Sequence, residues 1–192
     1  MLLTQARTFI STRTLARIAA VGAFAALTAL SARVTIPLPF TPVPVTLQVL
    51  AVLLSGLVLG PRDGAISQLA YLAAITAGLP LDAHMLGPAV WLTPDAGYLV
   101  GFVAGAFAAG WTAERARGRL TGAEVLAGAA GIFAIYTAGA TWLTIFFLHG
   151  NLAAGIAAGV APFILIDALK AALAAMASGT GRRAVRIAMG GR

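Results

Sequence analysis

The sequence contains no cysteine, so disulfides, thiol nucleophiles and thiolate metal ligands are all excluded. It also lacks the His-Glu-x-x-His pattern of zinc hydrolases and the Gly-x-Ser-x-Gly turn of serine hydrolases. Its single lysine, Lys170, follows Leu169 in an apolar run rather than a glycine-rich turn, so the chain has no P-loop and cannot hydrolyse ATP by itself. These absences argue against an enzyme, and we expect no catalytic residue, cofactor or metal.

Charge is also scarce, because only 10% of the 192 residues are charged while 60% are hydrophobic. Such a chain has too little polar surface to cover a water-soluble domain. Apolar runs of roughly 18 residues or more, each long enough to cross about 30 Å of hydrocarbon, recur along its length. The net charge of +7 is therefore interpreted through membrane topology rather than nucleic-acid binding. We expect one integral membrane domain, residues 1–192, in a lipid bilayer.

Hydropathy predicts an all-α bundle of six membrane spans, separated by breaks rich in proline and glycine. The expected spans are residues 15–36, 44–60, 64–80, 97–113, 123–148 and 158–178. An even number of spans puts both termini on one side, and almost every arginine falls on that side: Arg7, Arg13, Arg17, Arg62, Arg115, Arg117, Arg119, Arg182, Arg183, Arg186 and Arg192. Only Arg33 falls opposite. Since positive residues near span ends are retained in the cytoplasm, we expect cytoplasmic termini.

The first span has an alternative interpretation. Residues 1–17 carry arginines, an apolar stretch runs to Leu30, and the ending Leu30-Ser31-Ala32 loosely resembles the cleavage site of a signal peptide. The six-span count assumes that this helix is retained.

The stretch FILIDALKAAL, residues 163–173, places Asp167 and Lys170 inside the last apolar span. A charged side chain at the centre of a membrane helix costs about 2.5 to 3.5 kcal/mol, so both charges must face protein or water. Their spacing of three puts them on one helix face. If the helix begins near Val160, Asp167 lies about 10 Å below its outer end, within reach of a solute from outside. Pro162 suits a first turn or a kink there.

This pair presents a hydrogen-bond acceptor beside a donor, because a carboxylate can only accept and an ammonium can only donate. A ligand with a carbonyl next to an N–H matches it, as in amides, ureas, lactams and pyrimidine-like rings. Other interpretations stay open: a structural pair in a packed bundle, an intramembrane enzyme using Asp167 as acid or base, or a membrane scaffold. A further alternative is a proton-coupled carrier for another heterocyclic vitamin or amide-containing solute.

Two more stretches narrow the class of ligand. Residues 42–60 read PVPVTLQVLAVLLSGLVLG, followed by Pro61 and Gly64, and residues 94–102 read PDAGYLVGF. Together with DALK they resemble the BioY family, the biotin-specific substrate-binding components of energy-coupling factor vitamin transporters. The resemblance implies a six-helix fold of the S-component type in the inner membrane of a bacterium. It also implies that biotin is captured from outside, and that the partners are a membrane coupling subunit and two ATPase subunits.

The same resemblance assigns roles to individual residues. Asp167 would accept from the N–H groups of the ureido ring of biotin, and Lys170 would donate to its carbonyl. The apolar thiophane part would rest among Trp91, Tyr71 or Tyr98, which would equally suit interfacial anchors of helix ends.

Gln48, Asn151 and His84 are the remaining polar candidates near the outer half of the bundle. Gln48 and Asn151 could contact the ligand or bond helix to helix. His84 lies in the segment 79–97, which is either a cap over a site or an ordinary connector. Family members often carry a basic or amide residue in this loop for the valerate carboxylate, but residues 79–97 contain no Arg, Lys or Asn. Backbone N–H groups or His84 are the expected substitutes.

Docking to the coupling subunit uses small residues spaced by four on the first helix in this family, because they permit close backbone approach. The matching pairs are Ala16 with Ala20, Ala19 with Ala23, and Ala25 with Ala29. Alanine is abundant throughout the chain, so packing within the bundle also explains them.

Overall fold

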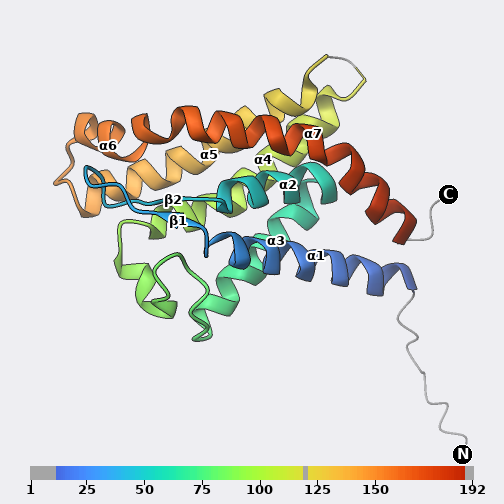
Figure 1. Ribbon diagram of the computed structural model, residues 1–192, viewed down its shortest axis with the longest axis horizontal. Coiled ribbons are helices and arrows are strands. Elements are labelled where there is room, and N and C mark those ends of the chain that lie inside the picture. Colours follow the sequence, from blue (N-terminus) through green and yellow to red (C-terminus); the bar gives the residue numbers. More distant parts are fainter. Residues whose placement is uncertain (1–11, 119–120, 189–192) are drawn as a thin grey trace, which may run out of the picture.

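The computed structural model describes residues 12–118 and 121–188, which are mostly helical (Figure 1). Within these ranges the α-helices are α1 (Thr12–Ser31), α2 (Gln48–Leu59), α3 (Pro61–Thr76), α4 (Ala96–Ala116), α5 (Ala123–Phe146), α6 (Leu152–Gly159) and α7 (Ile164–Ala188). Two 3-10 turns, η1 (Gly87–Leu92) and η2 (Ala161–Phe163), and two short strands, β1 (Thr35–Ile36) and β2 (Val45–Thr46), complete the fold. The strands pair antiparallel, with Thr35 opposite Thr46.

Four helical stretches are long and apolar enough to cross a membrane: Thr12–Ser31, Ala96–Ala116, Ala123–Phe146 and Leu152–Ala188, the last containing α6, η2 and α7. Many large apolar side chains on these helices are exposed, including Phe133 at 73%, Leu165 at 83% and Met176 at 79%. Exposed apolar surface on this scale is unfavourable in water and favourable in lipid. The chain is therefore a multi-pass membrane protein.

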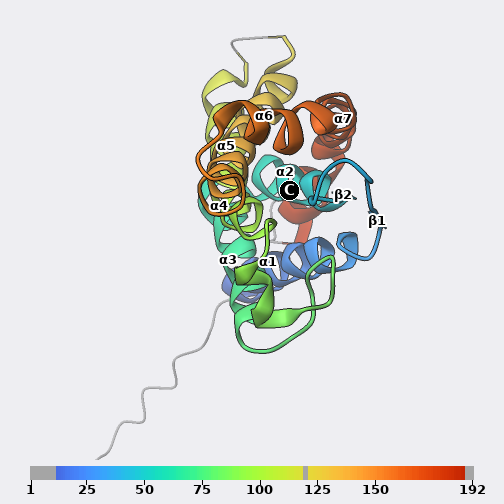
Figure 2. The same ribbon diagram turned by 90° about the vertical axis from the view of Figure 1, so that its left-hand side faces the viewer.

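Helix α2 lies at the centre of the bundle, with α1, α3, α4, α5 and α7 packed around it (Figure 2). Most of its residues are buried, and they are almost entirely apolar. A helix that is hydrophobic on every side belongs inside a protein or a bilayer, so this position follows from its composition. Its first residue, Gln48, lines the same cavity as β2 and the loop after α3.

Helices α4 and α5 form the closest pair in the bundle because glycines line their contact. Gly97, Gly101 and Gly105 recur every four residues on the face of α4 that meets α5. A Cβ at Gly101 would lie 2.9 Å from the carbonyl oxygen of Ile135, so a larger residue would push the helices apart. Small residues at this spacing allow membrane helices to pack backbone against backbone. The contact fixes Tyr98, on α4, relative to Tyr136, on α5.

Several helix boundaries differ from the expected spans for identifiable reasons. The second helix begins at Gln48 rather than residue 44, because Pro42 and Pro44 keep the preceding segment extended and Val45 pairs in the hairpin. The third begins at Pro61 rather than residue 64. Gly60, with φ of 85°, makes the turn alone, and Pro61 suits the first helical position.

The last expected span, 158–178, is replaced by two helices. α6 ends at Gly159, the turn η2 contains Pro162, and α7 begins at Ile164 and continues to Ala188. The prediction of a helix starting near Val160 is therefore wrong, because this residue has a non-helical backbone (φ −128°, ψ −57°) and Pro162 interrupts the helical hydrogen bonds. Asp167 consequently lies in the first turn of α7.

The start of α1 and the end of α7 lie at the same end of the bundle (Figure 1). Two ion pairs join helices there: Arg17 Nε donates to Asp63 at 2.6 Å, and Arg182 donates to Glu124 at 3.2 Å. Three of the arginines used to predict topology, Arg7, Arg119 and Arg192, lie outside the described residues.

Candidate functional site

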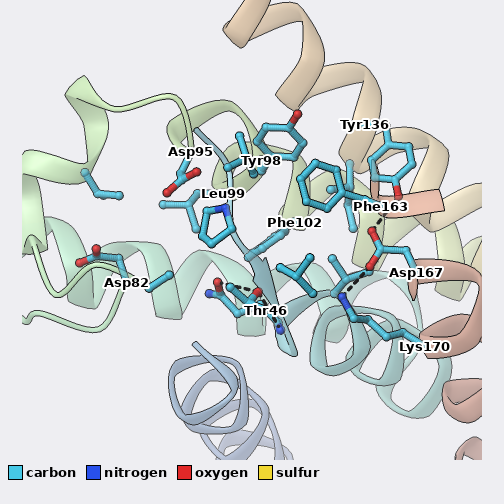
Figure 3. A pocket seen from close by; sticks show the side chains of 18 residues that line it. Thr46, Asp82, Asp95, Tyr98, Leu99, Phe102, Tyr136, Phe163, Asp167 and Lys170 are labelled. Atoms are coloured by element: carbon cyan, nitrogen blue, oxygen red, sulfur yellow. Dashed lines mark hydrogen bonds and ion pairs between the residues drawn. The ribbon is translucent and has the colours of Figure 1, made fainter. Parts of the chain in front are cut away.

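A cavity lies at the opposite end of the bundle from these ion pairs, and it is walled by β2, α2, α4, α5, α7 and the loop between α3 and α4 (Figure 3). It encloses about 590 Å³ of atom-free space, including the solvent at its mouth. Its lining is mostly apolar with a few polar and charged side chains, which is typical of binding sites for small molecules.

Asp167 and Lys170 lie together on the wall that α7 contributes. Lys170 Nζ donates to Asp167 Oδ1 at 2.6 Å, and the side chains are only 6% and 4% exposed. Asp167 Oδ2 accepts from the hydroxyl of Tyr136, on α5, at 2.7 Å. The carboxylate is thus held on both oxygens. An ammonium carries three donors, and in the described part of the chain Lys170 uses one of them, so it keeps donors for a ligand.

Apolar side chains fill the middle of the cavity wall. Leu99 and Phe102 come from α4 and Phe163 from η2, all at least 95% buried. The ring of Tyr98 joins them, while its hydroxyl donates to the carbonyl of Gly159 at 2.7 Å, at the end of α6. This apolar stretch separates the α7 pair from the polar groups across the cavity (Figure 3).

Gln48 lines the cavity at the first residue of α2. Its Nε2 donates to the hydroxyl of Tyr71 at 2.7 Å, and that hydroxyl donates to the carbonyl of Leu81 at 3.2 Å. Its Oε1 accepts from Thr46, which also lines the cavity, at 3.3 Å. Gln48 is therefore oriented by α3 and by the hairpin before any ligand arrives.

Two further carboxylates, Asp82 and Asp95, line the cavity on the side of the loop between α3 and α4 (Figure 3). Asp82 accepts from the backbone N–H groups of His84 and Gly87 at 3.0 and 2.7 Å, so it organises the loop. Asp95 Oδ2 lies 3.0 Å from His84 Nδ1. Burial raises the pKa of the Asp95 carboxyl to about 6, although the neighbouring His84 opposes this shift. In the described ranges, no three acidic or histidine side chains gather in a metal-binding arrangement.

Of the eight predicted ligand residues, the structure brings four to the cavity: Asp167, Lys170, Gln48 and Tyr98. The other four do not line it. Tyr71 lies behind Gln48, and His84 contacts the cavity only through Asp95. Trp91 donates its indole N–H to Thr76 at 3.2 Å. Asn151 is the N-cap of α6, where its side chain accepts from Ala154 N at 3.0 Å.

Sequence reasoning missed Tyr136 and Asp95. Tyr136 is a polar aromatic in the middle of the apolar helix α5, and its hydroxyl donates to Asp167 on α7. Asp95 stands within the PDAGYLVGF stretch, which served only to establish the resemblance. In both cases a polar residue within a mostly apolar stretch could have indicated a role in the site. The partner of each residue lies elsewhere in the sequence, however, and is seen only in the structure.

The alanines on α1 separate into two groups. Ala19 and Ala23 are exposed, whereas Ala16 and Ala20 are half-buried toward the rest of the bundle. Ala25 is half-buried and Ala29 buried. Of the three predicted pairs, one is therefore free for contact with another protein.

These features define a membrane-embedded helical protein with a buried solute cavity lined by opposite charges. The family model for the BioY family matches residues 4–187. The chain belongs to this family. It is 40% identical over 157 residues to the biotin transporter BioY of Thermotoga maritima, covering 81% of this chain and 89% of that protein.

Two other comparisons agree with this family. A probable biotin transporter BioY of Pyrococcus horikoshii is 37% identical over 155 residues, covering 80% of this chain and 88% of that protein. The crystal structure at 2.1 Å of the S-component for biotin from an ECF-type ABC transporter superposes with a TM-score of 0.79 at 26% identity. That match covers 91% of this chain and 93% of the other.

Proposed function

We propose that this protein captures biotin and serves as the substrate-specific component of an energy-coupling factor transporter for biotin uptake. The observation that carries the proposal is the buried Asp167–Lys170 pair on the wall of the cavity, in a chain of the BioY family. Two charges inside a membrane helix require a reason, and a small polar heterocycle supplies one. The proposed role is binding and transport, without chemical change to the ligand.

In the proposed pose, the ureido ring of biotin lies against α7. Lys170 donates to the ureido carbonyl, and Asp167 accepts from a ureido N–H while Tyr136 holds its other oxygen. The thiophane ring and the valerate chain then rest on Leu99 and Phe102. The hydrogen-bonding ends of the cavity set orientation, and the apolar middle supplies buried area.

We further propose that the chain is one integral domain of six spans in the cytoplasmic membrane. Helices α2 and α3 would form the two shorter spans, and α6, η2 and α7 together the last. The support is the charge distribution: Arg13, Arg17, Arg62, Arg115, Arg182, Arg183 and Arg186 lie at or near helix ends on one side, and Arg33 on the other. By the positive-inside rule both termini are cytoplasmic, and the cavity opens outward.

The proposed partners are a membrane coupling subunit and two ATPase subunits, because the chain has no P-loop of its own. The exposed Ala19 and Ala23 on α1 offer the close-packing surface for the coupling subunit. Replacing both with leucine is expected to abolish co-purification with the coupling subunit while biotin binding persists. Ala153 and Ala157, exposed at the same spacing on α6, provide the matched control pair.

A binding isotherm for biotin with the detergent-purified protein tests the main proposal. Asp167→Asn and Lys170→Met are each expected to weaken binding by at least about 1.5 kcal/mol, which is more than tenfold. An analogue whose ureido ring is opened to the diamine should lose affinity, whereas desthiobiotin, which keeps the ring, should bind. Stoichiometric recovery of unmodified biotin would distinguish binding from catalysis. Equal affinity of both variants and the parent would refute the ureido assignment.

A proton-coupled carrier is the second candidate, and the buried carboxyl of Asp95 in the cavity wall is the observation that favours it. Uptake that collapses with a protonophore in cells lacking the ATPase subunits would support that alternative. Uptake that requires those subunits would support the first proposal.

A further inference from the structure

The wall of the cavity across from Lys170 carries two carboxylates, Asp82 and Asp95, which differ in how many of their oxygens have hydrogen-bond partners. Asp82 accepts a backbone hydrogen bond on each oxygen. Asp95 is only 9% exposed. Its Oδ2 is paired with His84 Nδ1 at 3.0 Å. Its Oδ1 is buried without a hydrogen-bond partner within the described residues. A buried, unpaired carboxylate oxygen is costly, and Asp95 lines the cavity, so a donor that reached this oxygen would relieve that cost.

Among the described residues, those that surround Asp95 offer no buried cation to a negatively charged ligand. The titratable groups around it are His84 and Asp82 from the loop after α3, Tyr98 of α4 and Tyr71 of α3, and Arg33, from the segment after α1, acts on Tyr71. Arg33 donates to the backbone carbonyls of Pro80 and Asp82, at 3.0 and 2.7 Å. The imidazole of His84 is 43% exposed and already faces Oδ2 of Asp95.

Biotin carries its ureido ring at one end and a carboxyl group at the other. If the ring lies against Asp167 and Lys170, the tail points across Leu99 and Phe102 toward the acidic wall (Figure 3). Two ionised carboxylates in contact repel, and such pairs retain one proton between them. A protonated carboxyl beside a carboxylate instead forms a short, strong hydrogen bond.

We infer that Asp95 recognises the tail carboxyl of biotin through one shared proton, taken from water as biotin binds, while His84 orients Asp95. The inference rests on the proposed function and adds its regulation by pH. Burial raises the pKa of Asp95 to about 6, which makes its protonated form accessible near neutrality. In this proposal Asp95 binds the tail carboxyl, which a basic or amide residue in this loop would otherwise bind.

The direction of the pH dependence follows from proton balance. Below about pH 6 Asp95 already carries the proton, so the affinity for biotin is constant. Above that pH a proton must be taken up on binding, and the dissociation constant rises by roughly tenfold per pH unit. A tail without charge escapes this penalty. Biotinamide donates an N–H to Oδ1 of the ionised Asp95, and its affinity does not fall with rising pH.

The test is a set of isotherms from pH 5.5 to 8 for biotin and for biotinamide, using the purified full chain. For biotin, the parent protein is expected to lose at least tenfold in affinity between pH 6 and 8, and for biotinamide none. Asp95→Asn supplies a neutral donor, so its affinity for biotin should be independent of pH and exceed that of the parent at pH 8. Glu114→Gln, an exposed site at the far end of α4, is the control that keeps the parental slope.

His84 requires its own variant, because a protonated imidazole contacting the tail would also favour biotin at low pH. His84→Gln is expected to keep the slope and move its midpoint upward, since His84 lowers the pKa of Asp95. Loss of the slope in His84→Gln, or its persistence in Asp95→Asn, would overturn the inference. A constant affinity of the parent for biotin from pH 5.5 to 8 would do the same. The comparison of biotin with biotinamide on the parent protein does not depend on whether any variant folds. An absence of biotin binding at every pH would refute the proposed function itself.

Discussion

Asp167 and Asp95 are two acidic side chains on the walls of one cavity, but their surroundings differ. Asp167 is held on both oxygens, by Lys170 and Tyr136, which come from helices locked into the bundle. Asp95 precedes the first turn of α4, and one of its oxygens has no partner in the described part of the chain. Asp167, together with Lys170, is preorganised for a ligand of fixed polarity. Asp95, with that oxygen free, can instead gain or lose a proton. Substitutions at the two carboxylates and at their neighbours should therefore have different consequences.

The largest effect is expected from Lys170→Met, which leaves the buried carboxylate of Asp167 without its cation. Breaking a buried ion pair costs about 3 to 5 kcal/mol, so the protein should unfold at much lower temperature and lose biotin binding. The double variant Asp167→Asn with Lys170→Met removes both charges and should regain most of the stability but not the binding. Thermal unfolding in detergent, followed with a binding isotherm, separates these outcomes. A single variant as stable as the parent would contradict the importance of the pair.

A smaller effect is expected at Asp95 in the absence of biotin. Because burial raises its pKa from 3.8 to about 6, the folded state binds the proton more tightly than the unfolded state. The corresponding stabilisation is complete below about pH 4 and is lost as the pH rises through 6, a difference of about 3 kcal/mol. As the pH is raised from 4 to 7, the midpoint temperature of thermal unfolding should therefore decrease more for the parent protein than for Asp95→Asn. Parallel profiles of the two proteins would contradict this.

Tyr136→Phe probes the support of the completed pair. Its hydroxyl donates to Asp167 at 2.7 Å, and losing a hydrogen bond to a charged group costs about 1.5 to 3 kcal/mol. Part of this loss is recovered when Asp167 reorients toward the ligand, so we expect biotin affinity to fall roughly tenfold, a change of about 1.4 kcal/mol. Tyr98→Phe is the comparison, because its hydroxyl bonds Gly159 instead and should affect stability more than affinity.

The smallest effect is expected from Asn151→Ala, outside both sites. The N-cap of α6 is lost, which costs about 1 kcal/mol of stability, and the affinity for biotin should not change. A loss of affinity comparable to that of Tyr136→Phe would show that Asn151 reaches the ligand after all.

The sequence predicted those parts of the fold that follow from composition and local chemistry. The apolar stretches around α4 and α5, and the exposed apolar side chains of a membrane protein, follow from hydropathy alone. The shared face of Asp167 and Lys170 follows from helical spacing. Helix boundaries near prolines were harder to predict. Gly60 turns the chain in a single residue before Pro61, and Pro162 lies in the turn between α6 and α7.

The cavity wall itself could be anticipated only in part, because contacts between distant segments are not encoded in local patterns. The bond from Tyr136 to Asp167 joins residues 31 apart, and the bond from Gln48 to Tyr71 joins residues 23 apart. Asn151 shows that one local pattern fits two roles. A polar residue before an apolar run suggested a ligand contact, but Asn is also a preferred N-cap, and here it caps α6.

The proline-rich segment between β1 and β2 has a consequence for how quickly a ligand could come and go. Val43 and Pro44 form part of the cavity wall, and Thr41 fastens the segment to α6 by donating to the carbonyl of Ala158 at 2.7 Å. Prolines at positions 37, 39, 42 and 44 remove backbone donors that would otherwise anchor it. The side chains of Val43 and Val45 are also buried in the hydrophobic core. Moving this segment away from the cavity would therefore cost more than the single hydrogen bond of Thr41, because it would also expose apolar surface.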